Sequence, residues 1–200
     1  MKDRLFWIMQ SVNTIQALGY FLPINYLPSI AEALGLNSTL GSLTTTFINL
    51  AMVFGCVIVG SLSDRFDVNT VMFGVSVGTA ISVFTVLGFT TSIAPLFIFS
   101  VLYGLTASAY STTWGGIIKE VQKVHEATDA NVLFGLLAAG RGIGSVISGP
   151  LSESLLESSK GFNGNATSVY GSQYGPIIIF SGVTAFFGGV SWCFRRAGVI

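Results

Sequence analysis

Charged side chains are scarce in this sequence of 200 residues. Only 9% of the residues are Asp, Glu, Lys or Arg, whereas soluble domains average about 25%. The nine acidic and nine basic residues balance to a net charge of zero, so no electrostatic attraction to nucleic acid is expected. Hydrophobic residues make up 51% of the chain. So few charges cannot cover the surface of a soluble enzyme of this composition, which argues against that class of protein.

The residues that carry most enzyme chemistry are also nearly missing. The single histidine, His125, stands among charged residues between two apolar runs, and no Gly-x-Ser-x-Gly sequence supplies a nucleophile. Metal-binding clusters, phosphate-binding loops and dinucleotide fingerprints are absent from the sequence. The two cysteines, Cys56 and Cys193, have neither the spacing of a metal site nor that of a disulfide framework. We therefore expect no enzymatic activity, no metal and no cofactor.

Long apolar segments, by contrast, dominate the chain. Six of them are long enough to cross a bilayer. Each must do so as a helix, because the hydrocarbon offers no partner for an unpaired backbone group. The six segments cover residues 5–26, 40–62, 71–89, 93–118, 131–151 and 175–194. The sequence predicts an all-α membrane protein in which residues 1–200 form a single domain of six transmembrane helices.

Basic residues are distributed unevenly between the connections of the predicted helices. Six crossings would place seven of them on one side of the membrane: Lys2, Arg4, Arg65, Lys119, Lys123, Arg195 and Arg196. The opposite side has Lys160 alone. Because basic residues near helix ends favour the cytoplasm, both termini are expected there. The first apolar run is followed by further spans, so we expect it to remain as a helix and not to be cleaved as a signal peptide.

One charged residue, Arg141, interrupts the fifth apolar segment near its middle. An isolated arginine at that depth costs about 2.5–3.5 kcal/mol, so it needs a partner or a water-filled cavity. All nine acidic residues lie in loops or at the ends of the apolar segments, so no intramembrane carboxylate is predicted to pair with it. A guanidinium matches a carboxylate with two parallel hydrogen bonds, which favours an organic anion as the ligand. Backbone carbonyls or a helix outside this sequence are the alternatives.

The fifth segment has two distinct helical faces. Ser145, Ser148 and Ser152 follow Arg141 at helical spacing and share its face. The neighbouring stripe holds small residues that suit close contact with another helix: Gly135, Ala139, Gly142 and Gly149. One face is therefore predicted to pack against a helix, and the other to present a guanidinium with hydroxyl groups.

Polar residues in other apolar segments extend the predicted site. In the first segment, Gln10, Asn13 and Gln16 recur every three residues close to one helical face. This row favours a helix that lines a cavity, although interhelical hydrogen bonds would explain any one of the three amides. Asn49 and Tyr110 add an amide and a phenol from the second and fourth segments. The predicted substrate-binding residues are Arg141, Ser145, Asn13, Gln16, Tyr110 and Asn49.

Aromatic residues share one face of the fourth segment. Tyr103, Tyr110 and Trp114 are seven and four residues apart, a spacing that places them together on a helix. Such groups could line a pocket for an organic solute. Core packing of the tyrosines and interfacial anchoring of Trp114 are the alternatives.

The second segment ends in Gly60-x-x-x-Asp64-Arg65, which resembles the loop motif of the major facilitator superfamily. Two further stretches are similar to its fungal monocarboxylate-transporter-like branch: residues 19–27, and the Gly-Arg-Gly-x-Gly run that leads to residues 149–150. The match extends over nearly the whole chain and fits the C-terminal six of twelve helices. By this resemblance, Gly60, Asp64 and Arg65 form a gating-loop motif.

The resemblance implies a secondary transporter that moves a small monocarboxylate by alternating access, with or without proton symport. The implied partners are membrane lipid, a small organic anion, a proton, and a second six-helix half or a second copy of the chain. The plasma membrane is expected before the vacuole or another organelle. Since one half cannot enclose a central site alone, the alternative is a non-transporting or truncated membrane partner derived from such a transporter.

Overall fold

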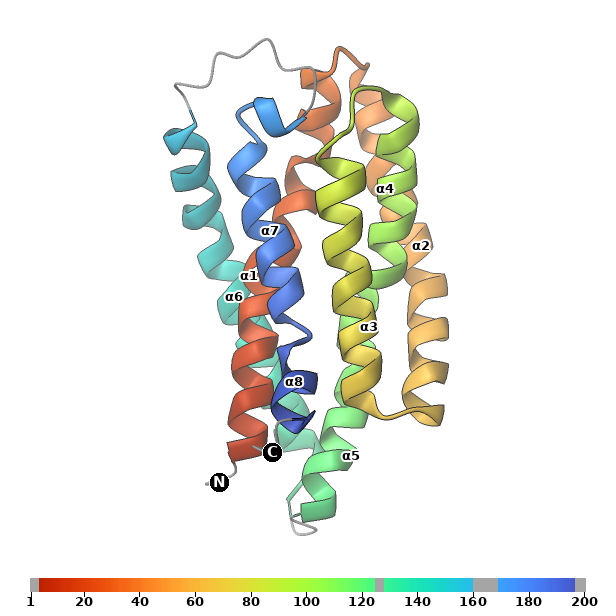
Figure 1. The fold of residues 1–200 in the computed structure, drawn as a ribbon, viewed down its shortest axis with the longest axis vertical. Coiled ribbons are helices and arrows are strands. Elements are labelled where there is room, and N and C mark those ends of the chain that lie inside the picture. The colour runs from red at the N-terminus through yellow and green to blue at the C-terminus, as the bar shows by residue number, and fades with distance from the viewer. Residues whose placement is uncertain (1–3, 125–127, 160–168, 197–200) are drawn as a thin grey trace.

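The computed structural model describes residues 4–124, 128–159 and 169–196. His125, Lys160 and Lys2, which entered the sequence argument, lie outside the described residues. The described part is helical, and none of it forms a β-strand. The helices run alongside one another as a bundle (Figure 1).

The six predicted spans correspond to six helical segments, and several of these are interrupted or extended relative to the prediction. The elements are α1 (Arg4–Ala33), α2 (Ser38–Arg65), α3 (Val68–Ile81) with a π-helical continuation (Ser82–Leu87), α4 (Ile93–Thr106), a 3-10 segment (Ser108–Thr113), α5 (Trp114–Val124), α6 (Ala130–Ser158), a 3-10 turn (Val169–Gly171), α7 (Gly175–Phe187) and α8 (Val190–Arg196). Span four thus comprises α4, the 3-10 segment and α5, and span six comprises α7 and α8. The predicted fold class, an all-α protein with six membrane-length segments, is confirmed.

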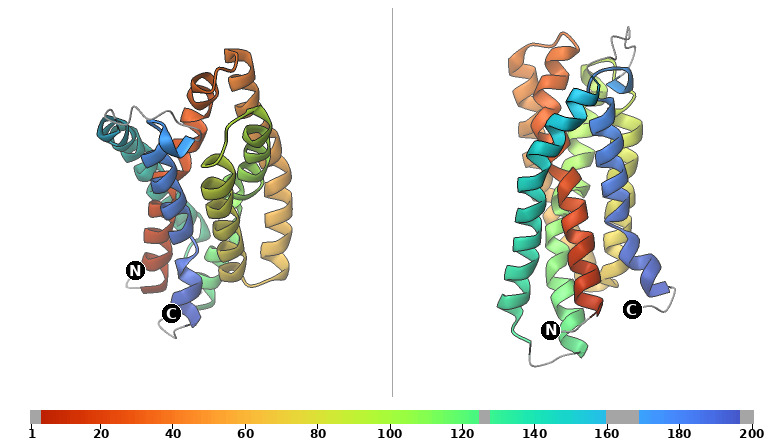
Figure 2. Two further views of the ribbon diagram at one scale, coloured as in Figure 1. Left: turned by 45° about the horizontal axis from the view of Figure 1, so that its top comes forward. Right: turned by 90° about the vertical axis from the view of Figure 1, so that its left-hand side faces the viewer.

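Five of these segments are both long and apolar enough to cross a membrane: Ser38–Arg65, Val68–Leu87, Ile93–Lys123, Ala130–Ser158 and Gly175–Cys193. Helix α1 is not among the five, and it carries the row of amides described above. Its 30 residues span about 45 Å at a rise of 1.5 Å per residue, more than the roughly 30 Å of hydrocarbon. It packs along α6 and α7, and Figure 2 shows it between them.

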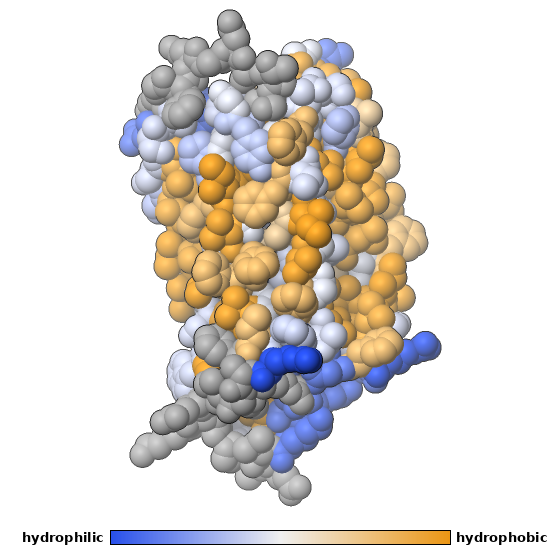
Figure 3. Space-filling view, in the orientation of Figure 1, coloured by the Kyte–Doolittle hydropathy of each residue, from blue (hydrophilic) through white to orange (hydrophobic). Residues whose placement is uncertain are grey.

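The ends of the bundle differ in polarity from its middle. Both termini lie at one end of the bundle, together with the α2–α3 connection and the last turns of α5 (Figure 1), as an even number of crossings requires. On the face that Figure 3 shows, hydrophobic residues cover the middle of the bundle, and hydrophilic residues gather most strongly at the end that holds the termini. This distribution is that of a multi-pass integral membrane protein, because apolar side chains face lipid and charges face water.

Helix α1 continues past the predicted boundary at residue 26 to Ala33. Pro23 and Pro28 lie inside it without ending it. Gly35 ends the helix because its φ of +79° is left-handed, a conformation that glycine adopts without a steric penalty. The Leu36 amide then donates to the Ala31 carbonyl at 3.1 Å, which completes a Schellman cap.

Close contact between α1 and α6 depends on two glycines of α6. A Cβ atom added to Gly140 would collide with Gln10 Nε2, and one added to Gly144 would lie 2.7 Å from Ala17 Cβ and 2.9 Å from the Thr14 carbonyl oxygen. The predicted stripe of small residues does not make this contact within the described part of the chain. Its four members are all exposed: Gly135, Ala139, Gly142 and Gly149.

Replacing Gly144 with valine is expected to destabilise the bundle by about 1–3 kcal/mol, the usual cost of an overpacked site. The new side chain would meet the Thr14 backbone, which cannot move aside as a flexible side chain does. Thermal unfolding in detergent, followed by the circular dichroism of the helices, measures the loss. Gly142→Val is the matched control, because nothing lies within 4 Å of a Cβ at Gly142. Equal unfolding temperatures for the two variants would contradict the assignment of the packing stripe.

Candidate functional site

Arg141 lies half-buried on α6 against the middle of α1. Its Nη1 atom donates a hydrogen bond of 3.3 Å to Gln16 Oε1. Its Cζ atom lies 4.3 Å from the centre of the Tyr20 ring and 5.8 Å from that of Phe21. Gln16 and Tyr20 are four residues apart and therefore share a face of α1. One turn of α1 thus gives the guanidinium an amide oxygen and an aromatic face.

Tyr20 is in turn fixed by Tyr103 of α4. The two rings are stacked, with centres 6.3 Å apart and planes 17° from parallel. The Tyr103 hydroxyl donates a hydrogen bond of 2.7 Å to the Tyr20 carbonyl oxygen, and the Phe99 ring packs 5.0 Å from Tyr103. Tyr103 is only 1% exposed. Helices α1, α4 and α6 therefore meet at the contact between Tyr20 and Arg141.

No carboxylate faces Arg141 within the described part of the chain. The ion pairs found there are Asp64–Lys119 and Glu120–Lys123. A cation over a ring gives about 2 kcal/mol when desolvated, and a hydrogen bond to a charged group about 1.5–3 kcal/mol. Together these are of the size needed to offset the roughly 2.5–3.5 kcal/mol cost of an arginine at mid-membrane. Since a guanidinium has five N–H donors, most remain for another acceptor.

Two other amides of α1 form hydrogen bonds between helices. Gln10 Nε2 donates to the Leu136 carbonyl at 2.7 Å, and Asn13 Nδ2 donates to the Leu137 carbonyl at 2.9 Å. Asn13 Oδ1 also accepts a hydrogen bond of 3.2 Å from Trp114 Nε1. Asn13 is fully buried. In the predicted row of amides, Gln10 and Asn13 connect α1 to its neighbours, whereas Gln16 alone faces Arg141.

The remaining predicted residues lie at varying distances from this arrangement. Ser145 is half-buried one turn beyond Arg141 on α6. Tyr110 is buried in the 3-10 segment and donates a hydrogen bond of 3.3 Å to the Gly188 carbonyl, between α7 and α8. Asn49 is exposed on α2 and donates to the Thr45 carbonyl of its own helix at 3.0 Å. The structure thus brings Gln16 to Arg141, places Ser145 beside it, and leaves Tyr110 and Asn49 bonded elsewhere.

Tyr20 and Tyr103 contribute to the site in ways that the sequence argument did not foresee. Tyr20 follows Gln16 by one helical turn and lies on the same face as the amides, a spacing that could have drawn attention to it. Tyr103 was considered as a pocket residue, but its contact with Tyr20 joins positions 83 apart in the chain. No local pattern reveals such a contact.

The loop motif lies at the end of the bundle that holds the termini. Asp64 Oδ1 accepts a hydrogen bond of 3.0 Å from Lys119 Nζ, which joins the end of α2 to α5. Both side chains are mostly exposed, so the pair contributes about 0–1 kcal/mol. Gly60 has open space beside its Cα, and Arg65 is exposed at the last turn of α2, where a cation complements the helix dipole.

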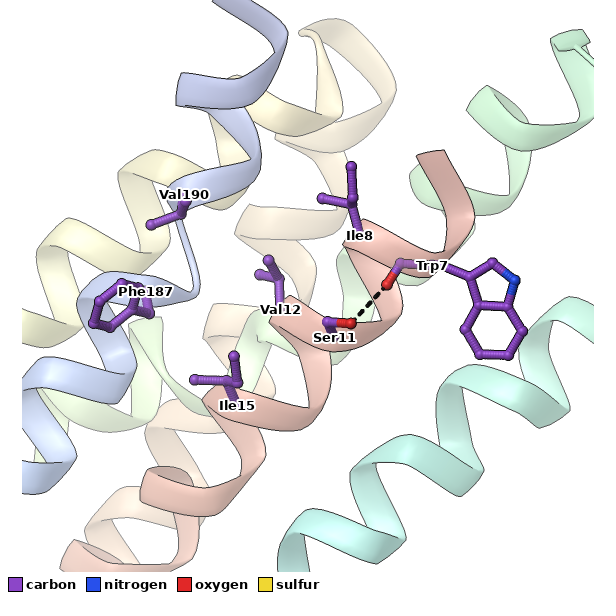
Figure 4. Close-up of a pocket in the computed structure, with 7 residues that line it drawn as sticks. All are labelled: Trp7, Ile8, Ser11, Val12, Ile15, Phe187 and Val190. Carbon is purple, nitrogen blue, oxygen red and sulfur yellow. Dashed lines mark hydrogen bonds between the residues drawn. The ribbon is translucent and has the colours of Figure 1, made fainter. Parts of the chain in front are cut away.

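An apolar groove of about 530 Å³ lies between α1 and the junction of α7 with α8 (Figure 4). Its lining is Trp7, Ile8, Ser11, Val12, Ile15, Phe187 and Val190. The one hydroxyl in this set, that of Ser11, donates to the Trp7 carbonyl of the same helix at 2.8 Å. The lining is almost entirely apolar, so its surface suits lipid chains better than a charged solute.

Comparison with known proteins identifies the family to which the sequence is similar. The sequence matches the Major Facilitator Superfamily over residues 11–198. It is 27% identical to MFS transporter asaE of Aspergillus flavus over 182 residues, which cover 91% of this chain and 38% of that protein. It is 28% identical over 182 residues to Aspyridones efflux protein apdF of Emericella nidulans, covering 86% of this chain and 32% of that protein.

Agnestins efflux protein AgnL12 of Paecilomyces divaricatus is 28% identical over 137 residues, which cover 67% of this chain and 31% of that protein. The chain therefore spans less than two fifths of the length of these relatives. Its all-helical bundle is consistent with half of the twelve-helix bundle that its sequence resembles. The match to the family covers almost all of its residues, and the chain belongs to the major facilitator superfamily.

Proposed function

We propose that this chain is the C-terminal half of a secondary transporter that moves a small organic anion, with Arg141 as the ligand of its carboxylate. One observation carries the proposal: the Arg141 guanidinium lies in a membrane-spanning helix without a carboxylate beside it in the described part of the chain. Where the effective dielectric constant is low, a charge attracts an anion more strongly than it does at a protein surface. A carboxylate can bind such a guanidinium through two hydrogen bonds.

Monocarboxylates are the first class of solute to consider. The resemblance to the monocarboxylate-transporter-like branch supports this class of solute, and a carboxylate matches the Arg141 guanidinium in charge and shape. Two relatives are named for the efflux of aspyridones and of agnestins, which favours export as the direction of transport. No acidic residue lies within the predicted apolar segments, so a proton-coupling carboxylate would have to come from outside this chain. We accordingly propose facilitated export. Proton symport is the alternative mechanism, and it would need a carboxylate from a second six-helix half.

Alternating access requires a second half on the other side of the site. Helices α2 and α6 offer faces for it, because only 28% of the apolar window of each is buried, against 47–50% for the other three segments of this kind. The exposed face of α2 also carries Thr46 and Asn49 among apolar residues. We propose that a second six-helix half, or a second copy of this chain, covers α2 and α6 and places these polar groups in the solute path.

The proposal includes an orientation. Arg65, Lys119 and Lys123 lie at the end of the bundle that holds both termini. Basic residues favour the cytoplasmic side, so that end is assigned to the cytoplasm. The plasma membrane is the location proposed from the resemblance.

Transport of ionised acids into proteoliposomes tests the proposed function. We expect purified protein to accumulate labelled pyruvate and phenylpyruvate at neutral pH, with a rate that saturates as the acid concentration rises. Unlabelled acid should compete, and the neutral analogue pyruvamide should not, because the charge is what Arg141 recognises. Accumulation of both acids no faster than into protein-free vesicles, by the chain alone and by the longer protein that contains it, would contradict the proposal.

A further inference from the structure

Arg141 is held by two uncharged side chains, Gln16 and Tyr20 of α1. We propose that Tyr20 is a positioning residue for Arg141: its ring holds the guanidinium at the α1–α6 boundary in the place of a carboxylate and leaves the cation available to the solute. This inference rests on the proposed function, since it concerns the same site. It assigns a role to a residue that does not itself need to touch the solute.

The shape of a guanidinium explains why a ring can do this without blocking the site. All five N–H groups lie in the plane of the guanidinium and point outward from its edges. A ring beneath the cation uses its face, whereas a carboxylate uses an edge. Arg141 Cζ lies over the Tyr20 ring, 4.3 Å from its centre, so the ring stabilises the charge without supplying an oxygen that would occupy the N–H donors. An acidic residue at the same place would occupy them.

The Tyr20 ring is itself held from two sides. Tyr103 stacks on it and bonds to its carbonyl oxygen at 2.7 Å. The neighbouring Phe21 ring meets it edge-on, with centres 4.8 Å apart. Tyr20 is 8% exposed, so the ring has little freedom to turn away from the cation. The ring against which the guanidinium rests is therefore fixed before the solute arrives, which lowers the entropy that binding must overcome.

This arrangement also indicates which anions the site prefers. A guanidinium edge presents two parallel donors, which match the two oxygens of a carboxylate. A halide offers a single point of contact and gains only one of the two bonds. We therefore expect carboxylates to compete with labelled pyruvate far better than chloride does at equal ionic strength.

Variants of Tyr20 test the positioning role through the concentration dependence of transport. Tyr20→Leu removes the ring and is expected to raise the KM for pyruvate about tenfold, in line with the loss of a desolvated cation–ring contact. The maximal rate should change less than KM, because the residue acts on binding. Tyr20→Phe keeps the ring and should remain within twofold of the natural protein. Tyr103→Phe keeps the stacked ring, loses its hydroxyl bond, and should give an intermediate KM.

The matched control is Tyr26→Leu, which removes a second tyrosine that joins α1 to α6. Its hydroxyl donates to Ser152 Oγ at 2.9 Å, away from Arg141, so thermal stability should fall while KM for pyruvate stays within twofold. An unchanged KM in Tyr20→Leu, or an equal rise in Tyr20→Phe, would overturn the positioning role. If Tyr20→Leu does not fold, the KM of Tyr103→Phe is the test, and an unchanged KM in that variant would overturn the positioning role. Loss of transport in Arg141→Ala together with an unaffected Tyr20→Leu refutes this inference alone, whereas unaffected transport in Arg141→Ala refutes the proposed function.

Discussion

Arg141→Ala is expected to lower the efficiency of pyruvate transport at least about 30-fold, because removal of one partner from a buried charge pair costs about 2–5 kcal/mol. The variant loses its bond to Gln16 and its contact with Tyr20, but it also loses the cost of keeping a cation in the membrane. The free energy lost with the two contacts and the free energy gained by removing the cation are similar in size and opposite in sign. Transport should therefore fall while the thermal unfolding temperature changes little, which separates loss of a ligand from loss of the fold.

Arg141→Lys refines this test. Lysine keeps the charge but offers a compact ammonium in place of a planar fork, and it neither stacks on a ring in the same way nor forms two parallel hydrogen bonds. We expect it to transport pyruvate with a raised KM, between the natural protein and Arg141→Ala. Lys123→Ala is the control for loss of a positive charge, since Lys123 is exposed and pairs with Glu120 on α5. Unchanged uptake and concentration dependence in Arg141→Ala would show that the site has been assigned to the wrong residue.

The positions of the membrane-spanning segments could be predicted from the sequence, because bilayer thickness sets their length and the hydrocarbon allows no structure other than a helix. The interruptions within these helices could not be predicted. Tyr110 lies in a 3-10 segment between α4 and α5, where the apolar run reads as continuous. Its hydroxyl bonds to Gly188, where α7 gives way to α8. Such breaks depend on contacts between helices that are distant in the chain, and the hydropathy of one segment does not contain that information.

The two stripes of α6 illustrate the same limit. Gly140 and Gly144 form the contact with α1, whereas Gly142 is exposed. Both stripes consist of small residues, and either would allow another helix to approach closely. The choice depends on how α6 is rotated about its axis, which is fixed by contacts such as those of Gln10 and Asn13 with α6 carbonyls, 126 and 124 positions away. The exposed stripe remains open to a helix that this chain does not supply.

The prediction made for Arg141 from the sequence omitted one kind of partner, an aromatic ring. It considered carboxylates, carbonyls, solutes and helices outside the chain. The ring of Tyr20 belongs to none of these, although a desolvated aromatic face contributes about as much as a hydrogen bond to a charged group. When an arginine in a membrane helix has no acidic partner, the search for its partners should therefore include aromatic residues that lie one turn from a polar residue on a neighbouring helix.

Gln16→Glu should convert the site from one that binds a solute carboxylate to one that contains its own. Gln16 Oε1 already accepts a hydrogen bond of 3.3 Å from Arg141 Nη1, so an introduced carboxylate would lie at the edge of the guanidinium. It would compete with the solute for the N–H donors of Arg141, which the Tyr20 ring has no oxygen to occupy. We expect the KM for pyruvate to rise at least about tenfold, since close charge pairs couple by about 1.5–7 kcal/mol. The thermal unfolding temperature should rise, because the buried cation gains a partner.

Gln10→Glu is the matched control for the last test, because it adds the same charge to the same helix two turns away. Gln10 faces the Leu136 carbonyl and no cation, so the substitution loses a donor and buries an unpaired charge. It should lower the unfolding temperature without the large rise in KM. Opposite effects of the two glutamates on stability would establish that the electrostatic partner of Arg141 is at position 16. A rise in stability with unchanged transport in Gln16→Glu would instead mean that Arg141 serves the fold, and that the solute binds to other groups.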